Sequence, residues 1–90
     1  MGHRIELGEI ELASLKSENV NQACCVYDYD AKKIVVFYTG SIAELEMRAH
    51  LQTLVPRYML PAAIIKLAAM PLTPNGKIDR KGLRERVKDL

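Results

Sequence analysis

One lysine at the tip of a predicted tight turn is the residue of this chain best placed to do chemistry. The stretch "PLTPNGKIDRKGL", Pro71–Leu83, contains two prolines and an Asn-Gly pair directly before Lys77. Asn-Gly strongly favours a tight turn because both residue types tolerate positive φ angles. A lysine after such a turn is held on a defined backbone, and its ammonium is a point charge suited to phosphate and carboxylate groups. On composition alone, a lysine in a turn is more commonly a surface residue.

The same stretch does not match a phosphate-binding loop. A Walker motif requires a glycine, four further residues, and then Gly-Lys followed by Ser or Thr. The Gly-Lys pair here has no glycine at the required earlier position, and Ile78 stands where the hydroxyl residue would be. Lys77 is therefore not predicted to belong to a nucleotide site of that kind.

The histidines and cysteines show no pattern typical of a metal site or a nucleophile. His3 and His50 lack a Cys, Asp or Glu partner at metal-ligand spacing, so we interpret both as structural or surface residues and predict no metal site. Cys24 and Cys25 are adjacent in a predicted strand, where neighbours point to opposite faces, so a mutual disulfide is not expected. Both are predicted to fill the core, without the nearby base that a nucleophilic cysteine needs.

The charged residues of the predicted helices are interpreted as solvated faces. Glu9 and Glu11 lie on different sides of one helix, so they do not form a two-carboxylate acid–base pair. The basic helix at the end of the chain has its cations balanced by acids and lacks interleaved aromatic residues, which argues against nucleic-acid binding. Its charges are Arg80, Lys81, Arg84, Arg86 and Lys88, with Asp79, Glu85 and Asp89.

Length and composition indicate one small domain. The chain has 90 residues, of which 49% are hydrophobic and 27% charged, and a formal net charge of +2. That charge is too small to indicate a nucleic-acid partner, and no apolar run approaches the roughly 20 residues of a membrane span. Cysteines without a predicted disulfide, and an N-terminus without a signal-peptide apolar region, favour a reduced, cytoplasmic protein. A domain this small has little room for both a substrate pocket and a nucleotide site, so an enzymatic role would make it part of a larger machine.

The first half of the chain is predicted to form a helix and a hairpin. Apolar residues with helical spacing and acids in the first turn predict a helix over Leu7–Lys16. Runs rich in β-branched and aromatic residues predict strands at Val20–Tyr29 and Ile34–Gly40. The short polar link between the two runs indicates an antiparallel hairpin.

The second half is predicted to contain a helix, a strand and a final helix. Ser41 followed by Glu44 has the pattern of a capping box, and the helix that it begins is expected to end at Pro56. Ala62–Met70 is predicted to be a strand because it is short, contains two adjacent isoleucines and is flanked by prolines. Together these elements predict an α+β domain with a three-stranded, mostly antiparallel sheet covered by helices. The apolar stripe expected on the middle helix consists of Ile42, Leu45, Ala49, Leu51 and Leu54.

Three segments of the chain closely resemble the last three core motifs of adenylate-forming ligases. They are "GHRIELGEIE" (Gly2–Glu11), "LVPRYMLP" (Leu54–Pro61) and "PLTPNGKIDRKGL" (Pro71–Leu83). The resemblance is nearest to the amino-acid adenylation domains of nonribosomal peptide synthetases and to D-alanine–carrier-protein ligases. Each motif is long and the three are collinear over nearly the whole chain, so the resemblance is specific.

The resemblance implies that residues 1–90 are the small C-terminal subdomain of such a ligase. The large N-terminal subdomain, with the phosphate loop, the ATP site and most of the substrate pocket, is absent, as is the aspartate hinge before the first motif. We therefore expect an excised, truncated or separately encoded piece that is inert and binds no cofactor alone, whereas the complete enzyme uses ATP and Mg²⁺. The acid that is activated cannot be read from this chain, and the first motif favours a carrier protein over coenzyme A as acceptor.

The resemblance also implies a role for each motif in a two-step reaction. A carboxylic acid and ATP first form an acyl-AMP, and Lys77, on a turn shaped by Gly76, contacts the substrate carboxylate and the α-phosphate. The subdomain then rotates, and Gly2, His3 and Arg4 border the tunnel through which the phosphopantetheine thiol of an acyl or peptidyl carrier protein takes the acyl group.

Most other motif residues are expected to have structural roles. Asp79 and Arg80 are expected to cap the last helix or to pair locally, and Ser14 is polar where many relatives are apolar. The residues expected to pack in the core are Ile5, Leu7, Ile10, Tyr58 and Met59. Two other functions stay open: a stand-alone, non-catalytic module that binds a carrier protein or another partner, and a nucleic-acid binder acting through the last helix.

Overall fold

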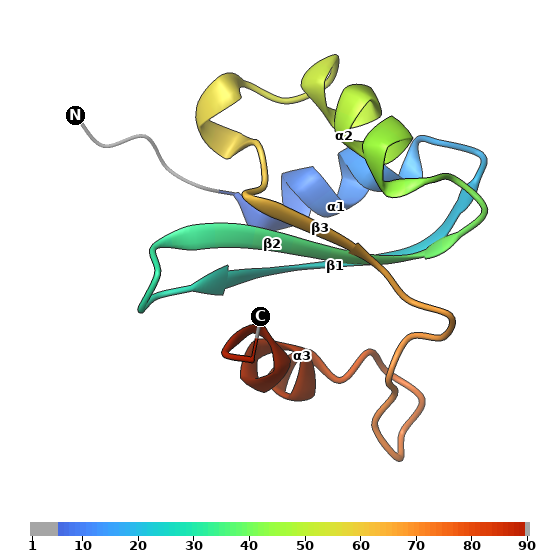
Figure 1. Cartoon of the computed structure of the whole chain (residues 1–90). Coiled ribbons are helices and arrows are strands. Elements are labelled where there is room, and N and C mark those ends of the chain that lie inside the picture. The colour runs from blue at the N-terminus through green and yellow to red at the C-terminus, as the bar shows by residue number, and fades with distance from the viewer. Residues whose placement is uncertain (1–5, 90) are drawn as a thin grey trace.

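The structure is a computed structural model that describes residues 6–89 and shows a three-stranded sheet between helices (Figure 1). The predicted order of helix, two strands, helix, strand, turn and helix is confirmed, and a short 3-10 helix is added in the proline-bounded connector. The elements are α1 (Leu7–Leu15), β1 (Val20–Asp28), β2 (Lys33–Gly40), α2 (Glu44–Gln52), η1 (Arg57–Met59), β3 (Ala63–Lys66) and α3 (Arg80–Val87). No helix in the described range is long and apolar enough to cross a membrane.

The sheet is mixed, with strand order β1-β2-β3. β1 and β2 form the predicted antiparallel hairpin, whereas β3 runs parallel to β2 because α2 carries the chain back across the sheet between them. The third strand is also shorter than the predicted Ala62–Met70 and ends at Lys66. Beyond it, Leu67 and Met70 are buried in the hydrophobic cluster that contains α3.

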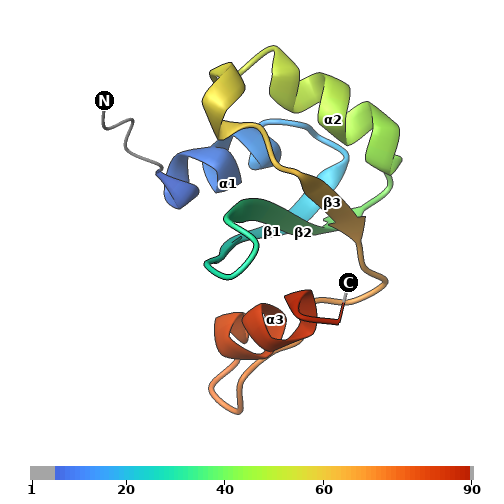
Figure 2. The same cartoon turned by 60° about the vertical axis from the view of Figure 1, so that its left-hand side comes forward.

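The helices cover both faces of the sheet and bury a separate hydrophobic cluster on each. Figure 2 shows α1 and α2 on one side and α3 on the other. Cys25 belongs to the cluster under α1 and α2, and its neighbour Cys24 belongs to the cluster under α3. The two thiols are free and buried, as the strand alternation predicted.

The cysteines are expected to resist thiol reagents in the folded chain. Burial raises the pKa of Cys24 and raises that of Cys25 from 9.0 to about 12, so neither forms the reactive thiolate near neutral pH. Titration with a disulfide reagent at pH 8 should be slow for the native chain and should reach both thiols in denaturant. The pKa of Cys25 is higher in the folded chain than in the unfolded chain, so folding favours the protonated thiol. Its contribution to the free energy of unfolding is therefore complete below pH 9 and is lost as the pH rises towards 12. Rapid native labelling would contradict this picture of the core.

α1 packs tightly despite its polar Ser14. The Ser14 side chain is fully buried, and its hydroxyl donates a hydrogen bond of 2.8 Å to the carbonyl oxygen of Ile10, which is also fully buried as predicted. His50 of α2 has a structural role here, because its Nε2 lies 2.8 Å from the carbonyl oxygen of Ala13 and must donate to it. Leu7 is partly buried against the same cluster, and the predicted core residue Ile5 lies outside the described residues.

The predicted capping box at Ser41 and Glu44 is wrong. α2 begins at Glu44 with Ala43 as its N-cap, and Glu46 accepts a hydrogen bond of 3.4 Å from the Ala43 backbone N–H. The reciprocal bond of a capping box is not made, because the Ser41 N–H donates 2.8 Å to the carbonyl oxygen of Asn19 and the Glu44 carboxylate accepts 2.8 Å from the Lys66 N–H. The contact between Ser41 and Asn19 ties the end of β2 to the loop before β1, so the helix starts later than the local pattern indicates.

The predicted apolar stripe on α2 is wrong in part, and the prediction that Tyr58 is buried is also wrong. The buried face consists of Met47 and Leu51, which are four residues apart, whereas Leu45 is 81% exposed because it lies on the opposite side of the helix. In η1, Met59 is buried as predicted, but the preceding Tyr58 is 43% exposed. Neighbouring residues of a short 3-10 turn point in different directions, so only one of the pair reaches the core.

Candidate functional site

The segment from Pro71 to Asp79 forms a small loop closed at its base. An isolated antiparallel bridge joins Leu72 to Ile78, and the Asp79 backbone N–H donates 2.9 Å to the carbonyl oxygen of Pro71. The two legs of the loop therefore leave and return to the body at one place.

The tip of this loop is the tight turn that Asn-Gly predicted. The Thr73 N–H donates 2.7 Å to the carbonyl oxygen of Lys77, and the Gly76 N–H donates 2.9 Å to the carbonyl oxygen of Thr73. The Thr73 hydroxyl oxygen also accepts from the Lys77 N–H at 3.3 Å. Gly76 has φ +83°, a conformation in which glycine is favoured over residues with a side chain. These bonds define the backbone of Lys77 while its side chain is exposed.

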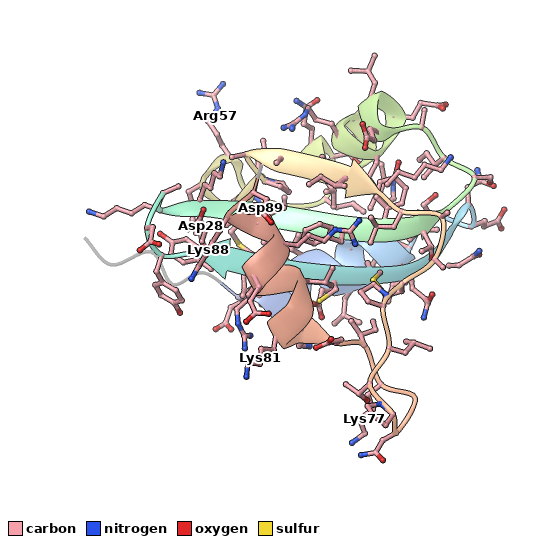
Figure 3. The ribbon with its side chains drawn as sticks, turned by 60° about the horizontal axis from the view of Figure 1, so that its bottom comes forward. Asp28, Arg57, Lys77, Lys81, Lys88 and Asp89 are labelled. Atoms are coloured by element: carbon pink, nitrogen blue, oxygen red, sulfur yellow. The ribbon has the colours of Figure 1, made fainter. Side chains whose placement is uncertain are left out.

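Lys77 lies at the far end of the loop, away from the sheet and the helices (Figure 3). An exposed ammonium on an ordered backbone can approach an anionic group on another body without first leaving a partner in its own core. The arrangement is suited to delivering one positive charge to a site outside the described residues.

The C-terminal end of the loop is held by the start of α3. Asp79 is the N-cap, and its Oδ1 accepts a hydrogen bond of 3.0 Å from the Gly82 N–H, so the predicted capping role is confirmed. A Cβ on Gly82 would lie 2.7 Å from Asp79 Oδ2, which explains the glycine at this position. Ile78 packs against the hydrophobic cluster under α3.

Arg80, the first residue of α3, pairs with Glu11 of α1 rather than locally. Its Nη1 lies 2.7 Å from Glu11 Oε2 and its Nη2 lies 3.0 Å from Glu11 Oε1, a two-bond arrangement that raises the pKa of Arg80. Glu11 Oε2 also accepts 2.7 Å from the Cys25 backbone N–H. The interpretation of Glu11 as part of a solvated face is therefore wrong: its side chain is only 14% exposed.

The other predicted site residues lie elsewhere. Gly2, His3 and Arg4 fall outside the described residues, so their predicted place beside a pantetheine tunnel stays a prediction. Among residues 6–89, no group of three or more His, Cys, Asp or Glu side chains could hold a metal ion. The described residues therefore supply no such cluster for the Mg²⁺ that the family resemblance gives to the complete enzyme.

Comparisons with known proteins point to one family. The family model described as AMP-binding enzyme C-terminal domain matches residues 9–77. Tyrocidine synthase 2 of Brevibacillus parabrevis is 46% identical over 87 residues, which are 91% of this chain and 2% of that protein. The chain thus spans a small fraction of the length of the curated relatives that it matches.

Solved structures of adenylate-forming enzymes share the fold. A four-domain nonribosomal peptide synthetase bound to AMP and glycine matches 89% of this chain and 6% of its own, with a TM-score of 0.76 and 37% identity. NpsA of Klebsiella oxytoca, in complex with 3-hydroxyanthranilyl-AMSN, matches 97% of this chain and 18% of its own, with a TM-score of 0.84 and 26% identity. The α+β fold expected from the sequence is that of their C-terminal subdomain.

Proposed function

This chain belongs to the AMP-binding enzyme C-terminal domain family, and we propose that it supplies Lys77 to the adenylation step of an ATP-dependent acid-activating ligase. The observation that carries the proposal is the exposed lysine at the end of an ordered, projecting loop. Residues 1–90 are then one C-terminal subdomain. Its partner is a large N-terminal adenylation subdomain, on the same or a separate chain, that holds ATP and the acid.

Charge explains why the step needs a lysine. A carboxylate oxygen of the acid attacks the α-phosphorus of ATP, a new P–O bond forms, and pyrophosphate leaves. Two anions must approach to bonding distance, and negative charge builds on the phosphate oxygens in the transition state. The Lys77 ammonium, touching both the carboxylate and the α-phosphate, offsets this charge in a site from which water is largely excluded.

In the second step the subdomain rotates, as the family resemblance implies. Rigid-body rotation about a hinge withdraws Lys77 and brings the segment of Gly2, His3 and Arg4 towards the acyl-adenylate. When bound there, the phosphopantetheine of a carrier protein would supply a thiol whose sulfur forms a bond to the acyl carbon as the bond from that carbon to AMP breaks, so that AMP and the thiol proton are released. The glycine leaves room for the narrow pantetheine arm to pass near the backbone.

Reconstitution tests the proposal. The chain is mixed with, or joined to, a matching N-terminal adenylation subdomain, and ATP–pyrophosphate exchange is measured across a panel of amino and carboxylic acids. We expect acid-dependent exchange well above that of either part alone. Both parts alone and a no-acid reaction are the controls. Capture of a carrier protein without any exchange in either arrangement would support the stand-alone binding module instead.

A further inference from the structure

Arg80 joins α3, α1 and β1 at the point where the loop that carries Lys77 ends. Its guanidinium makes the two bonds to Glu11 of α1, and its Nη1 also lies 3.4 Å from Cys24 Sγ on β1. Glu11 in turn accepts the Cys25 N–H of that strand. We call these two paired residues, Glu11 and Arg80, the clamp.

The clamp is rigid for physical reasons. A planar guanidinium bound to a carboxylate through two parallel hydrogen bonds fixes direction as well as distance. The carboxylate cannot swing freely, because Oε2 is shared between Arg80 and the Cys25 N–H, both at 2.7 Å. The Cys25 N–H that Glu11 accepts belongs to β1, an edge strand of the sheet. The clamp is therefore attached to the backbone of the sheet and not to another loop.

Chain connectivity couples the clamp to the lysine. Arg80 follows Lys77 by three residues, and the intervening Ile78 and Asp79 belong to the base of the loop. The other leg begins after Met70, which is buried in the cluster under α3. A projecting loop amplifies a small change of angle at its base into a larger displacement at its tip, so the orientation of the C-terminal leg decides where the ammonium arrives.

We infer that Glu11 and Arg80 are positioning residues for adenylation, which set the direction in which the loop presents Lys77. The inference rests on the proposed function, because it needs Lys77 to act on the reacting groups. Neither clamp residue touches substrate in this role. Their effect on the rate depends on Lys77, and this dependence distinguishes a positioning role from a purely structural one.

The test is a double-mutant cycle in the ligase formed by this chain and its N-terminal subdomain. Arg80→Ala should lower the rate of acyl-adenylate formation between about tenfold and about 100-fold, since a misplacement of roughly 1 Å can cost that much. In a Lys77→Ala background, the same change should lower the remaining rate by less than about twofold. Arg86→Ala, which removes an exposed arginine of the same helix, is the matched control and should leave the rate unchanged.

Each outcome decides something distinct. An equal loss in both backgrounds would mean that Arg80 only supports the fold and would overturn the inference, as would an unchanged rate in Arg80→Ala. An unchanged rate in Lys77→Ala would instead overturn the proposed function of the lysine, and the inference with it. Should Arg80→Ala fail to fold, Arg80→Lys and Glu11→Gln enter the same cycle. Glu11→Gln keeps an acceptor for the Cys25 N–H while it removes the charge that holds Arg80.

Discussion

Lys77→Ala is expected to lower the rate of acyl-adenylate formation by about 100-fold to about 1,000-fold in the complete ligase, the usual loss when one preorganised charge-stabilising group is removed. The carboxylate and the α-phosphate would then meet without the cation that offsets their repulsion. Single-turnover formation of acyl-AMP measures this step directly, because it is independent of thioester formation and of product release.

The folded chain should tolerate that substitution. Lys77 is exposed at the end of the loop, and its backbone bonds to Thr73 do not depend on its side chain. We expect the free energy of unfolding to change by less than about 0.5 kcal/mol. Lys81→Ala, which removes an exposed lysine on α3 instead of on the loop, is the matched control (Figure 3). A Lys77→Ala enzyme with an adenylation rate within about twofold of the unchanged one would show that the lysine has no catalytic role.

The elements that could be predicted from the sequence are those whose signals are local. Hydrophobic spacing and β-branched runs predicted the order of helices and strands, and Asn-Gly predicted the turn before Lys77, where Gly76 has its positive φ. The family resemblance, carried by long motifs, then identified the lysine as a candidate. A residue type and its neighbours are sufficient for features of this kind.

The features that were missed depend on contacts between distant segments. Glu11 and Arg80 are 69 positions apart, and neither has a local pattern that distinguishes it from a solvated charge on a helix. The capping signal at Ser41 failed because the Asn19 carbonyl, from another loop, takes its N–H. Long-range bonds outcompete local preferences worth about 1 kcal/mol each, so such sites become visible only when the fold brings the segments together.

Gly40→Ala is expected to destabilise the chain by about 3 kcal/mol. Gly40 ends β2 with φ +144°, and a Cβ there would lie 2.1 Å from the carbonyl oxygen of Asn19 and 2.9 Å from the Cα of Val20. Both atoms belong to the backbone, so no side-chain rotation relieves the clash. Relief requires Asn19 to move, which also disturbs its bond to the Ser41 N–H. For a small domain this is a large share of the total stability.

Gly8→Ala is the matched control for Gly40→Ala, because it makes the same chemical change at a position where alanine should stabilise the folded chain. Gly8 lies in α1, and apart from its chain neighbours and the nearby backbone of its own helix no atom lies within 4 Å of the position that a Cβ would take. Alanine is favoured over glycine in a helix by about 1 kcal/mol. Urea unfolding of the isolated chain measures both variants. In the complete ligase, Gly40→Ala should lose adenylation only in proportion to its unfolded fraction, whereas Lys77→Ala should lose it while fully folded. If Gly40→Ala were as stable as Gly8→Ala, the carbonyl oxygen of Asn19 would not lie as close to Gly40 as the structure places it.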